Sequence, residues 1–156
     1  MTTWFIADTH FGQQPQGRKK VTGMTGDELD ALMERLWRER VGPDDIVWHL
    51  GDIGPDIARL GTLPGRKYVI KGNNDPAPST LLKTGLFKDA FKEHVLHTDT
   101  ASLFLIHIPC DPPKEGLSVI HGHTHADDPL PGHRSVSVDR TGWAPITLED
   151  LLARGS

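Results

Sequence analysis

Five short stretches of the sequence carry side chains that could hold metal ions. Each places aspartate, asparagine or histidine among small residues, and in chain order they are "DTH" (8–10), "GD" (51–52), "GNND" (72–75), "HIP" (107–109) and "HGHTH" (121–125). Carboxylate, amide and imidazole groups together form the mixed ligand sets that first-row divalent ions accept. If the fold brings these stretches together, they can form a metal centre.

Each stretch taken alone has an ordinary structural alternative. Asp8 and His10 could belong to a turn with a solvated histidine, and a glycine followed by an aspartate is a common turn pair. The "GNND" stretch is also typical of a polar turn. His107 lies inside the apolar stretch "LFLIHIP", where a histidine is either a hydrogen-bonded core residue or a ligand. Only the convergence of several segments favours a metal centre.

The spacing within two of the stretches suggests how their side chains would bind metal ions. In an extended chain, residues i and i+2 point to the same side. We therefore expect Asp8 to share an ion with His10, and His123 to lie beside His125.

Asp52 and Asn73 suit two further positions in a centre with two ions. A carboxylate has two oxygens and can bridge ions about 3.5 to 4 Å apart. Asp52 is the single acid suited to that place. The amide oxygen of Asn73 can act as a neutral ligand, and it adds no negative charge that would weaken the binding of a phosphate.

Strands are predicted directly before these polar stretches. Runs of β-branched and aromatic residues end where the polar residues begin, at "TWFI" (3–6), "IVWHL" (46–50), "KYVI" (67–70), a hairpin over 94–109 that turns near Asp99, and "LSVIHGHTH" (117–125). In open α/β sheets, ligands bind at the carboxyl ends of the strands. The sequence therefore predicts one site built from five strand ends.

The segments between the strands indicate an α/β fold. Thr25 and Glu28 have the spacing of a capping box, and an apolar face recurs from there until Gly42. Residues 13–20 are predicted to be an exposed loop, and "RSVSVD" (134–139) a last strand before a short C-terminal helix that Thr147 caps. Helix-sized connections favour parallel pairing of the early strands, whereas short turns favour antiparallel or mixed pairing of the later ones.

Length and composition limit the classes of function. The 156 residues fit one domain, 1–156, with little room for a cap over the site. The net charge of -4 gives no overall field that would recruit nucleic acid or an anionic membrane. One cysteine, no signal peptide and no stretch long enough to cross a membrane lead us to expect a cytoplasmic protein.

The five stretches, in this order and covering residues 8–125, resemble the calcineurin-like metallophosphoesterases. The segments "DTHFG" and "VDRTGWAPITLEDL" are similar to the small bacterial and phage-type members of that family. The resemblance implies a sandwich of mixed β-sheets flanked by helices, without a cap domain, and a centre with two ions. Manganese is the first choice, with iron, zinc, nickel, cobalt and magnesium as alternatives. One ion would be held by Asp8, His10, Asp52 and His125, and the other by Asp52, Asn73, His107 and His123.

The same resemblance implies hydrolysis of a phosphoester by a hydroxide that bridges the two metals. Many relatives carry a histidine that can act as an acid where this chain has Asn74, and Asp75 is expected to orient Asn74 or the turn. An amide cannot transfer a proton, so we predict a phosphodiesterase that favours good leaving groups. Small relatives often have a further histidine where this chain has Gln13, so a substrate contact is missing there. His121 matches no ligand position and is expected to pack near its strand end.

Several alternatives stay open at this point. The same site could serve a phosphomonoesterase or a nuclease, and the same fold could be a non-catalytic scaffold, although a scaffold has no need of seven filled ligand positions. A structural zinc protein would favour cysteine-rich sites, whereas this chain has one cysteine. The sequence leaves open the substrate, the oligomeric state, whether His49 acts at the site, and whether residues 18–20 contact phosphate or form a solvated tip.

Overall fold

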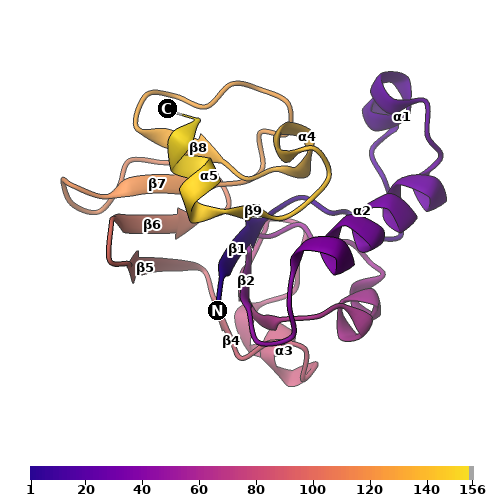
Figure 1. The fold of residues 1–156 in the computed structure, drawn as a ribbon, viewed down its shortest axis with the longest axis horizontal. Coiled ribbons are helices and arrows are strands. Elements are labelled where there is room, and N and C mark those ends of the chain that lie inside the picture. The colour runs from indigo at the N-terminus through magenta and orange to yellow at the C-terminus, as the bar shows by residue number, and fades with distance from the viewer. Residues whose placement is uncertain (155–156) are drawn as a thin grey trace.

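The computed structural model describes residues 1–154 and contains two β-sheets (Figure 1). The first sheet has the order β4-β3-β2-β1-β9, and its strands are β1 (Thr3–Ile6), β2 (Ile46–His49), β3 (Arg66–Ile70), β4 (Asp89–Phe91) and β9 (Ile146–Thr147). The first four strands are parallel, whereas β9 runs antiparallel to β1. The parallel pairing predicted for the early strands is confirmed.

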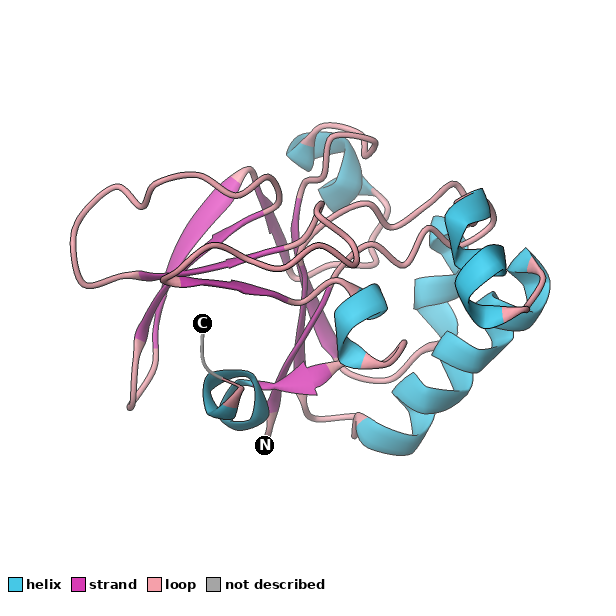
Figure 2. Ribbon diagram, turned by 90° about the horizontal axis from the view of Figure 1, so that it is seen from above, coloured by secondary structure: helices cyan, strands magenta, loops and turns pink. Residues whose placement is uncertain are grey.

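The second sheet is mixed, as predicted. Its order is β5-β6-β7-β8, and its strands are β5 (Glu93–His97), β6 (Ser102–Ile106), β7 (Ser118–His121) and β8 (His133–Ser135). The β5–β6 hairpin is antiparallel, with His97 opposite Ser102, so the turn lies where it was predicted. The pairs β6–β7 and β7–β8 are parallel. Figure 2 shows the two sheets as separate layers, with the long helix beyond the first one.

Six helical segments flank the sheets. They are α1 (Gln16–Thr22), α2 (Gly26–Arg40), the 3-10 helix η1 (Ile57–Thr62), α3 (Pro78–Lys83), α4 (Val138–Thr141) and α5 (Leu148–Ala153). The capping box predicted at the start of α2 is present: the Thr25 side chain accepts a hydrogen bond from the Glu28 N–H, and the Glu28 carboxylate accepts one from the Thr25 N–H. Thr147 likewise caps α5.

The first sheet divides its apolar residues between two cores. Successive side chains of a strand point to opposite faces, so Ile6 packs with α2 while its neighbour Phe5 packs between the sheets. Leu105 and Ile120 of the second sheet and Leu151 of α5 complete the core between the sheets. Because both faces of β1 and β2 are largely buried, their sequences are mostly apolar runs rather than alternating ones. The rigid strand ends that result position the polar stretches.

Two parts of the sequence fold differently from the prediction. The segment predicted as an exposed loop over 13–20 overlaps α1, whose Arg18 is buried. The strand predicted over 134–139 ends at Ser135, and α4 begins at Val138. His133 at the start of β8 is buried against His121, with ring centroids 5.8 Å apart. Among residues 1–154, no helix has the length and apolar character needed to span a membrane.

Candidate metal centre

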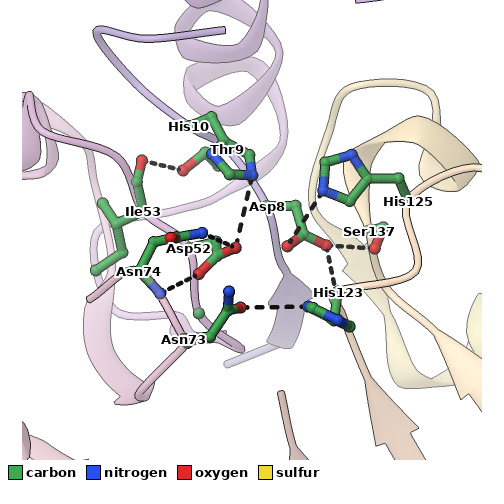
Figure 3. A network of polar contacts seen from close by, with 12 residues as sticks. Asp8, Thr9, His10, Asp52, Ile53, Asn73, Asn74, His123, His125 and Ser137 are labelled. Atoms are coloured by element: carbon green, nitrogen blue, oxygen red, sulfur yellow. Dashed lines mark hydrogen bonds and ion pairs between the residues drawn. The ribbon is translucent and has the colours of Figure 1, made fainter. Parts of the chain in front are cut away.

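The predicted site residues follow the ends of strands that share one edge of the structure. Asp8 lies two residues after β1, Asp52 three residues after β2, and Asn73 three residues after β3. From the second sheet, His107 directly follows β6 and His123 lies two residues after β7. The parallel strands of the two sheets therefore present their carboxyl ends to the same region, and side chains from both sheets meet there (Figure 3).

The potential ligands form two groups, in each of which the ligand atoms lie within 4.8 Å of one another. The first group is Asp8, His10 and His125, and the second is Asp52, His107 and His123. His123 and His125 thus belong to different groups despite their spacing of two residues.

Asn73 and Asp52 complete this arrangement. The Asn73 Oδ1 lies 3.0 Å from the His107 Nε2 and 3.2 Å from the His123 Nδ1, so the amide faces the second group. The Asp52 Oδ2 lies 3.5 Å from the His107 Nε2 and 3.7 Å from the His10 Nε2. The Asp52 carboxylate, a member of the second group, therefore also lies within reach of His10 of the first group (Figure 3).

The backbone at these positions is not extended, contrary to the prediction. Five candidate ligands have positive φ angles, which are 60° at Asp8, 46° at His10, 57° at Asp52, 71° at His123 and 49° at His125. Such left-handed conformations are uncommon for residues with a side chain, and they cluster at functional sites. The premise of an extended chain was therefore wrong, although Asp8 and His10 do lie in one potential ligand group, as expected. The strands end before the ligands, and tight loops aim each side chain.

The Asp8 carboxylate is anchored by one oxygen and free at the other. The Ser137 hydroxyl and the His123 N–H, which is 2.9 Å away, both donate hydrogen bonds to the Oδ2. The Oδ1 is buried and has no hydrogen-bond partner within residues 1–154. Burial, in particular, raises the pKa of Asp8 above its ordinary value. A cation bound to the Oδ1 would favour the charged form of this buried group.

His10 also fits a cation. Its Nε2 is buried, and no residue in the described part of the chain forms a hydrogen bond with it. Burial and the neighbouring Arg18 guanidinium lower the pKa of His10 to about 4, so the imidazole is neutral at pH 7 and can offer a lone pair. Two orphaned atoms, on Asp8 and His10, thus lie in one potential ligand group, which is the arrangement that a metal ion would satisfy.

Asp52 and His107 form the central pair of the second group. Burial alone would raise the pKa of Asp52, but the hydrogen bond and charge of His107, with the two N–H groups that Asn74 donates, hold it well below its usual range. Burial lowers the pKa of His107, but the carboxylates of Asp52 and Asp8 outweigh this effect and raise the pKa above its ordinary value. The His107 Nδ1 lies 2.7 Å from the Leu50 carbonyl oxygen and donates to it, so the Nε2 is the nitrogen that faces the site.

Asp75 holds the loops that carry Asp52 and Asn73. Its Oδ2 accepts hydrogen bonds of 2.8 Å from the N–H groups of Asp52 and Gly72, and its Oδ1 accepts one of 3.1 Å from the Ile53 N–H. A side chain at Gly72 would have its Cβ 2.3 Å from the Asp52 nitrogen, so only glycine allows the two loops to meet. Asp75 therefore positions Asp52 through its backbone, and both of its oxygens are engaged in doing so.

Three residues, Arg18, Ser137 and Asp139, support the first group in roles that the sequence did not predict. The Arg18 guanidinium donates to the Asp8 carbonyl oxygen at 2.6 Å and to both oxygens of Asp139, at 2.7 and 3.1 Å. The Asp139 Oδ1 lies 3.7 Å from the His125 Nδ1, and Ser137 holds Asp8 as described above. No short sequence pattern links them, because 121 residues separate Arg18 from Asp139. Arg18 is thus neither a phosphate-contacting nor a solvated residue.

Two other histidines lie outside both groups. The His49 Nδ1 accepts a hydrogen bond of 3.1 Å from the Gly51 N–H, and its Nε2 lies 3.0 Å from the Thr9 hydroxyl. Burial and the neighbouring His107 lower its pKa to about 3, so His49 is neutral and supports the loop. The His121 Nδ1 lies 2.8 Å from the carbonyl oxygen of Gly122, and the ring is buried near its strand end.

A cleft of about 760 Å³ adjoins the first group. Its lining includes His10, Gln13, Pro55, Ile57 and Asn74. Gln13 and Asn74 are exposed, so their amides are available at its surface. The cleft offers room beside the potential metal ligands for the organic part of a substrate.

Comparison with known proteins identifies similar phage proteins. The Gene 66 protein of Mycobacterium phage L5 is 30% identical over an alignment of 197 positions, gaps included, which covers 95% of this chain and 90% of the relative. The Gene 66 protein of Mycobacterium phage D29 is 29% identical over an alignment of 191 positions, which covers 94% of this chain and 92% of the relative. No protein-family model matches the chain.

Two solved structures share the fold. A protein of unknown function from Aquifex aeolicus superposes with a TM-score of 0.78 at 20% identity, covering 98% of both chains. A novel archaeal phosphodiesterase superposes with a TM-score of 0.54 at 17% identity, covering 88% of this chain and 82% of that one. The fold, two mixed sheets flanked by helices, is therefore shared with both of these proteins.

Proposed function

This chain belongs to the family of the Gene 66 proteins of Mycobacterium phages L5 and D29, and we propose that its members with this site are metal-dependent phosphodiesterases with two ions. The observation that carries the proposal is the pair of ligand groups with the Asp52 carboxylate between them. A group of Asp and His side chains can serve structure, but two adjacent groups that share a carboxylate suit phosphoester hydrolysis. The phosphoesterase fold supports the same reaction class.

The donor atoms suit two exchangeable first-row ions. We assign one ion to Asp8, His10 and His125 and the other to Asn73, His107 and His123, with Asp52 shared between them. The ligands are oxygen and nitrogen without thiolate, a set that accepts manganese and its neighbours rather than closed structural zinc. When bound, two ions lower the pKa of water and neutralise the oxygens of a phosphate.

The remaining site residues hold this arrangement and shape the choice of substrate. Asp75 fixes the Asp52 backbone, and Ser137 with the His123 N–H fixes one oxygen of Asp8. Asn74 lies at the edge of the cleft and donates its amide to the Asp52 Oδ2 at 3.0 Å. An amide can hydrogen bond to a leaving group but cannot protonate it. We therefore favour diesters with good leaving groups over monoesters of alkyl alcohols.

A hydrolysis panel tests this function. Protein stripped with a chelator is supplied separately with manganese, magnesium, zinc, nickel and cobalt, and assayed on bis(p-nitrophenyl) phosphate and on p-nitrophenyl phosphate. We expect no activity without metal and faster hydrolysis of the diester with manganese. Faster hydrolysis of the monoester would instead support a phosphomonoesterase. The absence of hydrolysis with every ion would leave the non-catalytic scaffold as the better account.

A further inference from the structure

Three arginines surround a second cavity, of about 350 Å³, between β8, α4 and α5. We call it the arginine pocket, and the residues that define it are Asp128, Arg134, Ser135, Arg140, Leu151 and Arg154. Guanidinium groups stay charged at all ordinary pH values, so the pocket holds three positive charges against one negative charge. This local excess of positive charge occurs in a chain whose net charge is -4.

The hydrogen bonds of the three arginines leave donors free. Arg140 donates to the Ala126 carbonyl oxygen and to Asp128, and Arg154 donates to the Arg140 carbonyl oxygen. Arg134 differs from these two arginines, because its Nε is buried without a hydrogen-bond partner among residues 1–154. A buried donor without a partner is costly, and a bound acceptor would satisfy it.

Two features of the pocket suit an anion rather than a neutral ligand. Asp128 is 93% exposed, and an exposed ion pair contributes little, so an incoming anion can replace its carboxylate on Arg140. Ser135 is buried and its hydroxyl oxygen accepts from the Ser137 N–H, which leaves the hydroxyl proton to donate. Guanidinium groups bind phosphate through paired hydrogen bonds, so a phosphate group is the anion that this set fits best.

The arginine pocket adjoins the metal centre along the chain. Ser135 is two residues from Ser137, which holds Asp8, so their Cα atoms are at most about 7 Å apart. Asp128 is three residues from His125, within about 11 Å. A molecule with several phosphates can therefore reach both places, as a nucleotide chain does with one phosphate per nucleotide.

From this geometry we propose that the arginine pocket binds a phosphate group of a nucleotide chain whose neighbouring phosphodiester lies at the metal centre. The placement of the neighbouring phosphodiester at the metal centre rests on the proposed function, whereas phosphate binding in the arginine pocket does not. Free inorganic phosphate presents the same chemistry, and the experiment separates the two sources.

The binding experiment uses the complete, metal-free protein, so that hydrolysis plays no part. A fluorescein-labelled single-stranded oligothymidylate is titrated with wild type, Arg134→Gln and Arg154→Gln, and inorganic phosphate is titrated in parallel by calorimetry. The matched control is Arg35→Gln, which removes the same charge from an exposed position on α2. We expect each pocket variant to weaken oligonucleotide binding by about tenfold, the cost of one hydrogen bond to a charged group, and the control to change it less than twofold. Thermal melting checks that each variant is folded.

The hydrolysis experiment uses manganese-loaded protein and two esters of the same leaving group. Thymidine 3′-(p-nitrophenyl phosphate) has one phosphate, and its 5′-phosphorylated form has a second. Arg134→Gln should raise KM by about tenfold for the second ester alone, with kcat unchanged. Equal effects on both esters, or equal binding losses in Arg134→Gln and Arg35→Gln, would overturn the proposal. The proposal would also be overturned if binding of inorganic phosphate depended on Arg134 while binding of the oligonucleotide did not. If wild type hydrolyses neither ester, the proposed function fails, and the binding experiment still decides whether the pocket takes the phosphate of a nucleotide chain.

Discussion

Five proposed metal ligands have a left-handed backbone conformation, which lowers the stability of the folded protein. Each such residue costs about 1 to 2 kcal/mol relative to an ordinary conformation, and glycine does not incur this cost. The strain persists because Asp75, Ser137 and Arg18 hold the loops from outside the ligand set. The residues that we propose as metal ligands thus reduce the stability of the metal-free protein.

His125 offers a direct test of this strain, because its φ is 49° and its side chain is partly exposed. His125→Gly and His125→Ala both remove the imidazole, but only glycine relieves the backbone. We expect the metal-free glycine variant to have a free energy of unfolding about 1 kcal/mol higher than the alanine variant, as measured by urea denaturation. Equal stabilities would show that the positive φ angle carries no strain.

Under the proposed function, Asn74 determines which leaving groups we expect the protein to accept. Because the amide cannot protonate an alkoxide, Asn74→His should raise rates for alkyl leaving groups by up to about 10²-fold and leave aryl esters nearly unchanged. Steady-state hydrolysis of matched aryl and alkyl diesters measures this. Metal content is the control, since a new imidazole could capture an ion. Equal acceleration of both ester classes, or of neither, would mean that residue 74 does not face the leaving group.

His49 makes stability depend on pH in a predictable direction. Its pKa in the folded protein is about 3, below the ordinary value of 6.5, so between these values the unfolded chain binds a proton that the folded one does not. Stability is therefore fully present above pH 6.5 and is lost as the pH falls toward 3. One such proton corresponds to about 1.4 kcal/mol per pH unit. Urea denaturation of metal-free His49→Asn between pH 6.5 and 4.5 should show a slope smaller by nearly that amount, and an unchanged slope would contradict the assignment.

At the scale of elements, the sequence was most informative where periodicity and caps act locally. The strands before each polar stretch, the capping box of Thr25 and the β5–β6 hairpin are all present as predicted. Helix α1 was missed because a buried polar residue, Arg18, anchors it in place of an apolar face. The left-handed loops were missed because non-glycine residues give no signal of positive φ, which depends on contacts between distant segments.

The pair of Arg18 and Asp139 joins α1 to α4 beneath the first ligand group. Both side chains are nearly buried, with exposures of 3% and 10%, so the loss of one partner leaves a charge without its partner. We expect Arg18→Met to lower the free energy of unfolding by about 3 kcal/mol, and the double variant Arg18→Met and Asp139→Leu to recover part of that loss. A double-mutant cycle by urea denaturation measures the coupling. Additive losses would show that the two residues act independently.

At the scale of the whole molecule, two sheets from different parts of the chain each contribute ligands to both groups. Asp8 and Asp52 come from the first sheet, whereas His107, His123 and His125 come from the second. The proposed metal centre therefore lies at the edge where the parallel strands of both sheets end. The cleft lies beside one group, and the arginine pocket adjoins the same centre along the chain. An extended substrate that crosses the centre would be consistent with this arrangement.

The number of metal ions per chain tests the central claim most directly. Manganese is titrated into metal-free wild type and into Asp52→Asn by calorimetry, with circular dichroism to verify that the variant is folded. Because Asp52 lies between the two ligand groups, we predict two ions per wild-type chain and at most one per chain in Asp52→Asn, with most of the diester hydrolysis lost. One ion per wild-type chain, or two ions with full activity in Asp52→Asn, would contradict the account.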